Sequence, residues 1–143
     1  MTFQKKLYSA VLAGALTLSI GSMTSFASNY YDTAFTFNFD IGTNVAYTSA
    51  RAKDDNTSAY MKLQKLQGGT NPTYTASVVR ENYTNFSKTW YYSFSSVNIN
   101  QGRYLSNYAY EDDGAGVKVR IKATRGADPN GFYGSGLWSP DSL

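Results

Sequence analysis

The sequence contains no cysteine and no histidine. The absence of cysteine excludes disulfide bonds, thiolate metal sites and lipid attachment through an N-terminal cysteine, so packing alone must stabilise the folded chain. The absence of histidine removes the most common general base and the most common metal ligand. Few of the side chains that usually perform catalysis are therefore present, and we expect neither a metal ion nor another cofactor.

The sequence also lacks a hydrophobic run that would suit a membrane-spanning helix. The run from Leu7 to Ile20 has about 14 residues, against the roughly 20 that a spanning helix needs. It follows Lys5-Lys6 and precedes Ser25-Phe26-Ala27, which has small residues at the positions that a signal peptidase recognises. We therefore predict a secretory signal peptide over residues 1–27, cleaved between Ala27 and Ser28, in preference to an N-terminal anchor. The mature chain would be exported and would have no membrane span.

Charged residues are scarce, at 16% of the chain. Removal of Lys5 and Lys6 with the signal peptide leaves 11 of the 13 basic residues against 10 acidic ones. A near-neutral mature chain gives no general electrostatic reason to bind nucleic acid, which favours a clustered basic surface. We therefore expect no nucleic-acid partner.

Aromatic residues are abundant, and most of them are Tyr (13) or Phe (8). These side chains are enriched in β-strands because they fit a pleated surface. The clearest strand runs from Gly116 to Thr124, where apolar residues alternate with basic or polar ones. Successive side chains point to opposite faces of a strand, so this segment has one apolar face for a core and one basic face. The apolar residues are Val117, Val119, Ile121 and Ala123.

Similar alternation predicts six more strands, over residues 33–41, 45–52, 58–66, 73–81, 89–96 and 103–111. The buried faces that we expect contain Phe35, Phe37, Phe39 and Ile41 in the first strand, and Trp90, Tyr92 and Phe94 in the fifth. Asp112-Asp113-Gly114 predicts a tight hairpin turn. The segment 126–136 is rich in Gly and Asp, and we predict no strand there.

About seven strands within roughly 110 residues, joined by closely spaced turns, indicate one all-β domain over residues 28–143. The expected fold is a single antiparallel β-sandwich of the immunoglobulin-like or jelly-roll-like type. A small β-barrel is the alternative.

The basic face of the strand at 116–124 is the first candidate for binding. Lys118, Arg120 and Lys122 could attract an anionic surface polymer or a lipid headgroup. Alternatively, they form a solvated strand face whose charge discourages aggregation between sheet edges, and we favour this simpler interpretation.

Tyrosines supply the second candidate. Tyr104, Tyr108 and Tyr110 share one face of the strand predicted at 103–111, and Tyr91 lies nearby in the sequence. An exposed tyrosine face would suit stacking on sugar rings or burial at a protein interface. A covered face would only stabilise the sheet. We assign no catalytic and no metal-ligating residue.

Two acidic clusters, Asp54-Asp55 and Glu111-Asp112-Asp113, could supply oxygen ligands to calcium. Neither has the Asp-x-Asp-x-Asp-Gly spacing of a calcium loop, so we favour turn formation. Glycoside hydrolysis needs only two carboxyl groups, which leaves a small glycan hydrolase using Glu81 or Glu111 as an alternative.

The chain ends in Gly136-Leu137-Trp138-Ser139-Pro140-Asp141-Ser142, where we expect Trp138 to dock in the core and hold the terminus. Together with a short signal peptide and Cys-free strands rich in Tyr, Thr and Asn, this ending resembles a family of small exported proteins of Gram-positive bacteria whose function is unknown. The resemblance covers the whole chain and implies secretion. It implies no activity and no site residues.

These observations predict a secreted, non-enzymatic protein that binds outside the cell or at the cell surface. Its partner would be a glycan, a cell-wall polymer or another surface protein. A secreted effector similar to a bacteriocin is the main alternative, and the glycan hydrolase is a further one.

Overall fold

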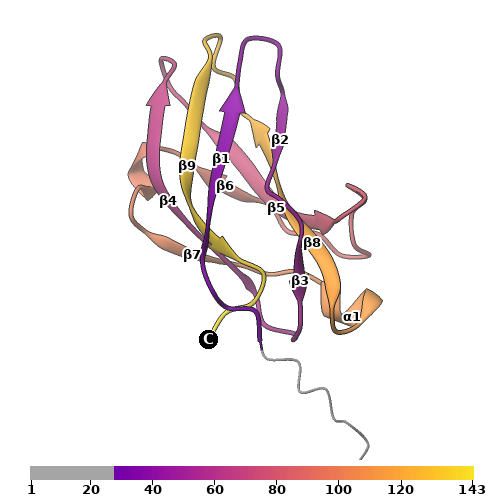
Figure 1. The fold of residues 1–143 in the computed structure, drawn as a ribbon. Coiled ribbons are helices and arrows are strands. Elements are labelled where there is room, and N and C mark those ends of the chain that lie inside the picture. The colour runs from indigo at the N-terminus through magenta and orange to yellow at the C-terminus, as the bar shows by residue number, and fades with distance from the viewer. Residues whose placement is uncertain (1–27) are drawn as a thin grey trace, which may run out of the picture.

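The computed structural model describes residues 28–143, which form two antiparallel sheets packed against each other (Figure 1). The predicted signal peptide lies outside the described residues. In the first sheet the strand order is β1 (Thr33–Phe39), β9 (Phe132–Ser139), β4 (Ala59–Gly68) and β7 (Gly102–Leu105). In the second it is β2 (Val45–Tyr47), β8 (Val117–Arg125), β5 (Tyr74–Arg80) and β6 (Tyr92–Phe94), and β3 (Arg51–Lys53) also pairs with β8. The predicted all-β sandwich is confirmed: residues 28–143 form nine strands and no closed barrel.

The alternating residues of β8 are buried and exposed as their pattern predicts. Val119, Ile121 and Ala123 are fully buried between the sheets, whereas Lys118 is exposed on the outer face. β8 pairs with β5 on one side and with β2 and β3 on the other. β8 is therefore an interior strand of the second sheet, and its apolar face packs in the core between the two sheets.

Aromatic rings from both sheets form the centre of the core. Phe37 of β1 packs edge-on against Tyr74 of β5, at 5.6 Å between ring centroids. Tyr74 in turn stacks on Phe94 of β6 at 5.1 Å. These contacts join the two sheets, because Phe37 belongs to one sheet and Tyr74 to the other. Burial of each such ring stabilises the fold by roughly 1.5–3 kcal/mol.

The sequence analysis missed one strand: it predicts none over residues 126–136, whereas β9 occupies the middle of the first sheet from residue 132 onward. Its inward residues are Phe132, Gly134, Gly136 and Trp138, so two glycines interrupt the apolar pattern. Gly136 is required by packing: a Cβ there would lie 2.0 Å from the carbonyl oxygen of Lys62 in β4. The glycines mark a close approach of two strands here, and not a loop.

Two further predicted strands are shorter than expected. β7 ends at Leu105, and a short helix, α1 (Ala109–Asp113), replaces the second half of the strand predicted at 103–111. The Asn107 side chain accepts the N–H of Ala109 (3.2 Å), and the fully buried Ala109 anchors the helix on the core. Gly114, with φ of 81°, ends this helix in place of the predicted hairpin turn.

The strand predicted at 89–96 shrinks to the three residues of β6, followed by a 3-10 turn, η1 (Ser96–Asn98). Phe94 is buried as predicted, but Trp90 lies outside the strand and packs half-buried against Tyr108, at 5.5 Å between centroids. Ile41 was also misplaced: β1 ends at Phe39, and Ile41 is 80% exposed in the turn that follows.

The segment predicted as one strand at 45–52 is divided into β2 and β3. Thr48, between them, is buried, and its hydroxyl accepts the N–H of Ile121 in β8 (2.9 Å). A side chain thus takes the place of a backbone acceptor and interrupts the pairing.

Between residues 28 and 143, no helix is long and apolar enough to cross a bilayer.

Candidate functional site

A row of outward-facing side chains crosses one end of the four-stranded sheet. Tyr104 of β7 lies opposite Tyr60 of β4, and Tyr60 lies opposite Ser139 of β9. Asp32 immediately precedes β1 and continues the row beside Ser139. Residues at the same register on adjacent strands share a face, so the pairing brings together four positions that are far apart in the sequence.

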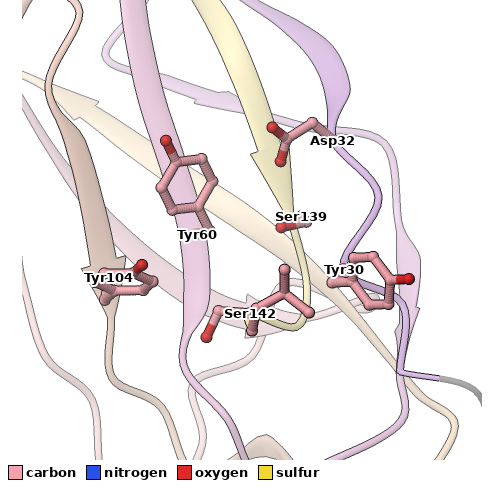
Figure 2. A pocket seen from close by; sticks show the side chains of 7 residues that line it. Tyr30, Asp32, Tyr60, Tyr104, Ser139 and Ser142 are labelled. Carbon is pink, nitrogen blue, oxygen red and sulfur yellow. The ribbon is translucent and has the colours of Figure 1, made fainter.

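This row forms part of a cleft, which we call the tyrosine cleft. It has a volume of ≈ 260 Å³. The N-terminal segment adds Tyr30, and the C-terminal tail adds Ser142 and Leu143. In Figure 2, Tyr60 and Tyr104 lie on one side and Tyr30 on the other, with the Asp32 carboxylate toward the top of the view. Both ends of the described chain therefore contribute to one site.

Tyr60 occupies its place because β4 alternates. Ala59, Met61 and Leu63 are buried, which turns Tyr60 to the outer face. Its ring lies over Gly102 of β7: a Cβ at that glycine would be 2.5 Å from the Tyr60 hydroxyl oxygen. A glycine on the neighbouring strand thus leaves the space that the ring fills.

The electrostatic environment of Tyr60 is negative. Partial burial raises the pKa of its hydroxyl, and the charge of Asp32 and the nearby Tyr104 hydroxyl raise it further. The rings of Tyr60 and Tyr104 are 5.7 Å apart, tilted by 57°. The two aromatic rings therefore lie together on β4 and β7, and the Asp32 carboxylate faces the same cleft from beyond Ser139 of β9 (Figure 2).

A buried ion pair holds the C-terminal side of the cleft. Lys53 Nζ lies 2.9 Å from Asp141 Oδ1, and the two side chains are 1% and 0% exposed. Lys53 also donates to the carbonyl oxygens of Pro140 (2.8 Å) and Thr57. The hydroxyl of Ser139, a cleft residue, donates to the Asp141 carbonyl oxygen (2.8 Å). β3 is thereby tied to the tail that follows β9.

The same carboxylate holds the N-terminal segment. Asp141 Oδ2 accepts the backbone N–H of Asn29 (2.7 Å), and the Asn29 side chain donates to the Ala52 carbonyl oxygen (2.8 Å). The Asn29 amide oxygen accepts a hydrogen bond from Arg51 (2.6 Å), whose guanidinium lies over the Trp138 ring, 5.4 Å from the centroid. These contacts fix the segment that carries Tyr30 and Asp32.

The structure separates the four tyrosines that the sequence grouped together. Tyr104 lies in the tyrosine cleft and is 60% exposed. Tyr91, 64% exposed, precedes β6 in the other sheet. Tyr108 packs against the core at the start of α1, and Tyr110 lies on that helix. The predicted common face is wrong, because it required a strand where α1 forms.

The three predicted basic residues do share the outer face of β8, on the sheet that does not carry the cleft. Lys118 Nζ lies 3.7 Å from Glu81 Oε1. Arg120 donates to the carbonyl oxygens of Glu81 (3.0 Å) and Thr48 (2.9 Å). Lys122 lies opposite Tyr47 of β2 and is half-buried. Lys118 and Arg120 thus have local partners within the fold.

The acidic clusters make local contacts. Asp55 accepts the N–H of Thr57 (2.8 Å), Asp112 accepts the N–H of Ser87 (2.7 Å), and Asp113 pairs with Arg80 (2.6 Å). In the described part of the chain, no group of three or more acidic side chains could hold a metal ion. Glu81 and Glu111, the residues of the hydrolase alternative, are not among those that line the tyrosine cleft.

Sequence reasoning missed Tyr30, Asp32, Tyr60, Ser139 and Ser142 as cleft residues. The alternation of β4 was a signal that Tyr60 faces outward, but no local pattern pointed to the others. The tyrosine cleft can bind a ligand by stacking against rings and by hydrogen bonding to hydroxyl and carboxylate groups.

Comparison with known proteins identifies the family of the chain. The model of DUF2712, described as a protein of unknown function, matches residues 23–142. No curated protein and no solved structure matches the chain. The family match agrees with the resemblance to a family of unknown function, whereas the Gram-positive origin stays a prediction. Because the match spans nearly the whole sequence, the protein belongs to the DUF2712 family.

Proposed function

We propose that the protein is exported and acts outside the cell as a non-enzymatic binding protein, with a glycan or a sugar-containing wall polymer bound in the tyrosine cleft. The observation that carries this proposal is the convergence of Tyr30, Tyr60 and Tyr104 on one open cleft. Tyrosine presents a flat apolar ring together with a polar hydroxyl. A sugar ring has matching apolar and hydroxyl-bearing surfaces.

The size and shape of the cleft favour one unit of a longer polymer. Pockets that enclose small molecules have volumes of about 300–1,000 Å³. The tyrosine cleft, at ≈ 260 Å³, is slightly below this range, and Tyr104 remains 60% exposed at its side. A chain of sugars could place one ring in the cleft while the neighbouring units extend across the sheet.

The sequence pattern of residues 1–27 supports export, because its basic start, apolar run and small residues match a signal peptide. The chain contains no cysteine, so its core closes without a disulfide. A protein of this kind can fold by packing alone after it leaves the cell.

The test is binding of the purified protein to isolated wall polysaccharide and peptidoglycan fractions. Tyr104→Ala removes a cleft ring, whereas Tyr91→Ala removes an equally exposed ring outside the cleft. We expect Tyr104→Ala to weaken binding about fivefold to tenfold, the usual cost of losing one aromatic contact, and Tyr91→Ala to have no effect. Equal losses for the two variants would place the ligand elsewhere, and failure of the unaltered protein to bind any fraction would refute the proposal.

A further inference from the structure

We propose that the tyrosine cleft recognises a trimethylammonium group of the kind that choline carries. This inference rests on the proposed function and specifies the chemistry of its ligand. It is carried by the combination of tyrosine rings with an acidic side chain in the same cleft.

The rings supply the first part of such a site. A cation is attracted to the negative face of an aromatic ring, and several rings around one cavity bind alkylated ammonium groups. Tyr60 and Tyr104 stand 5.7 Å apart on one side, and Tyr30 lines the other side. A neutral acetamido or hydroxyl group would gain stacking contacts there but no cation–π attraction.

Asp32 supplies the negative charge. Its carboxylate is exposed in the cleft, and it forms no ion pair within residues 28–143. Arg51 is the nearby cation, but its guanidinium already bonds to the Thr33 hydroxyl (3.1 Å), the Trp138 carbonyl oxygen (3.0 Å) and Asn29 (2.6 Å). Asp32 is therefore available to pair with a cation from the ligand.

The described side chains that line the cleft include a carboxylate but no lysine or arginine. Asp54, Asp55 and Asp141 belong to the same end of the fold, where Asp141 accepts the backbone N–H groups of Asp54 (3.0 Å) and Asp55 (3.5 Å). Lys53 pairs with Asp141 and the Arg51 guanidinium lies over the Trp138 ring, so neither of these cations forms an ion pair with Asp32.

Nearby negative charge adds to the effect of burial on two pKa values at this end of the fold. Burial and the charges of Asp141 and Asp55 raise the pKa of Asp54, against the smaller opposing effect of Lys53. Burial, Asp32 and Tyr104 raise the pKa of Tyr60 inside the cleft. A negative potential of this kind concentrates cationic ligands and repels anionic ones.

The test compares two ligands of almost the same shape. Choline carries a trimethylammonium group, and 3,3-dimethylbutan-1-ol replaces its nitrogen by carbon and is neutral. Titration of the purified protein, followed by NMR shifts of its tyrosine resonances, should show choline binding at least about tenfold more tightly than the neutral analogue. Bound choline should also lower the pKa of Tyr60, because a nearby cation stabilises its ionised form.

Two variants that each remove one negative charge test whether the Asp32 carboxylate pairs with the ammonium group. Asp32 and Asp40 flank opposite ends of β1, and both are exposed. Asp32→Asn should weaken choline binding about fivefold or more and leave the neutral analogue unaffected. Asp40→Asn should leave both affinities within about twofold of the unaltered protein, because an exposed charge at the other end of the strand is screened by salt.

Absence of choline binding, equal affinity for the two ligands, or unchanged choline binding in Asp32→Asn would overturn the ammonium assignment. If one of these results is found but the protein still binds wall fractions, and Tyr104→Ala still weakens that binding, the proposed function stands with a neutral ligand. Failure of the unaltered protein to bind any wall fraction is the separate result that refutes the proposed function.

Discussion

Replacement of Lys53 by Met tests whether the buried ion pair with Asp141 holds the fold together. The two charges are 2.9 Å apart and almost wholly inaccessible to water. Lys53→Met leaves the Asp141 carboxylate buried without its counter-ion, and it also removes the donor to the carbonyl oxygens of Pro140 and Thr57. Breaking one partner of a buried pair costs about 3–5 kcal/mol.

This cost is large for a single domain. A chain of this length has a total free energy of unfolding of roughly 5–15 kcal/mol. At about 4 °C per kcal/mol, the melting temperature should fall by roughly 12–20 °C. Urea denaturation followed by tryptophan fluorescence measures the loss directly, since Trp138 lies close to the pair in the sequence and packs in the core.

Two matched variants make this test specific. Lys118→Met removes a lysine from the exposed pair with Glu81, at 3.7 Å, and should cost less than about 1 kcal/mol. In the double variant Lys53→Met, Asp141→Asn, the buried charge is gone while an oxygen remains to accept a backbone N–H, so it should recover about 2 kcal/mol relative to Lys53→Met. If Lys53→Met costs no more than Lys118→Met, or if the second change brings no recovery, the ion pair does not have the structural role that we assign to it.

Three further predictions concern single sites. Tyr74→Phe should raise the free energy of unfolding by about 1 kcal/mol in urea titrations, because the buried hydroxyl of Tyr74 has no hydrogen-bond partner among the described residues; a clear loss of stability would reveal a partner. Gly102→Ala should weaken wall binding without lowering the melting temperature by more than a few degrees, since its methyl group would displace the Tyr60 ring and not the backbone; unchanged binding would show that the ring position is irrelevant. Three backbone N–H groups donate to the Asp128 carboxylate and lower its pKa, and the N–H of Asn130 has the largest effect. The ionised carboxylate therefore stabilises the fold fully above the ordinary carboxyl pKa of about 4. This stabilisation is lost as the pH falls through the lower pKa of the folded state. Between about pH 5 and pH 2 the unaltered protein should therefore lose more stability than Asp128→Asn in urea titrations, and parallel losses would contradict this.

Local periodicity was sufficient to predict β8 and β5, the two central strands of the second sheet. Val119, Ile121 and Ala123 alternate with charged residues, and an isolated strand of this composition has only one way to bury its apolar face. The same reasoning placed Phe35, Phe37 and Phe39 inside. The expectation that a docked side chain holds the terminus separately placed Trp138 in the core. Periodicity failed in β9, because Gly134 and Gly136 face the core without providing the apolar signal on which the reasoning depends.

The prediction that tyrosines share one face of a strand at 103–111 failed for a related reason. Tyr104, Tyr108 and Tyr110 have the spacing of one strand face, but Asn107 and the buried Ala109 start a helix there. The preference of an aromatic residue for strands is weak, and burial of a neighbouring side chain was sufficient to override it. Of the three, only Tyr104 stays on a strand.

The sequence by itself determined which side of each regular strand meets water, since that depends only on the two-residue repeat of the extended chain. It also determined that the fold is all-β and has no disulfide. Only the tertiary structure decided that Tyr104, Tyr60, Ser139 and Asp32 form one row, because strand order and register depend on pairing between distant segments. The Lys53–Asp141 pair, whose partners are 88 residues apart, likewise exists only because the packed sheets bring β3 and the C-terminal tail together.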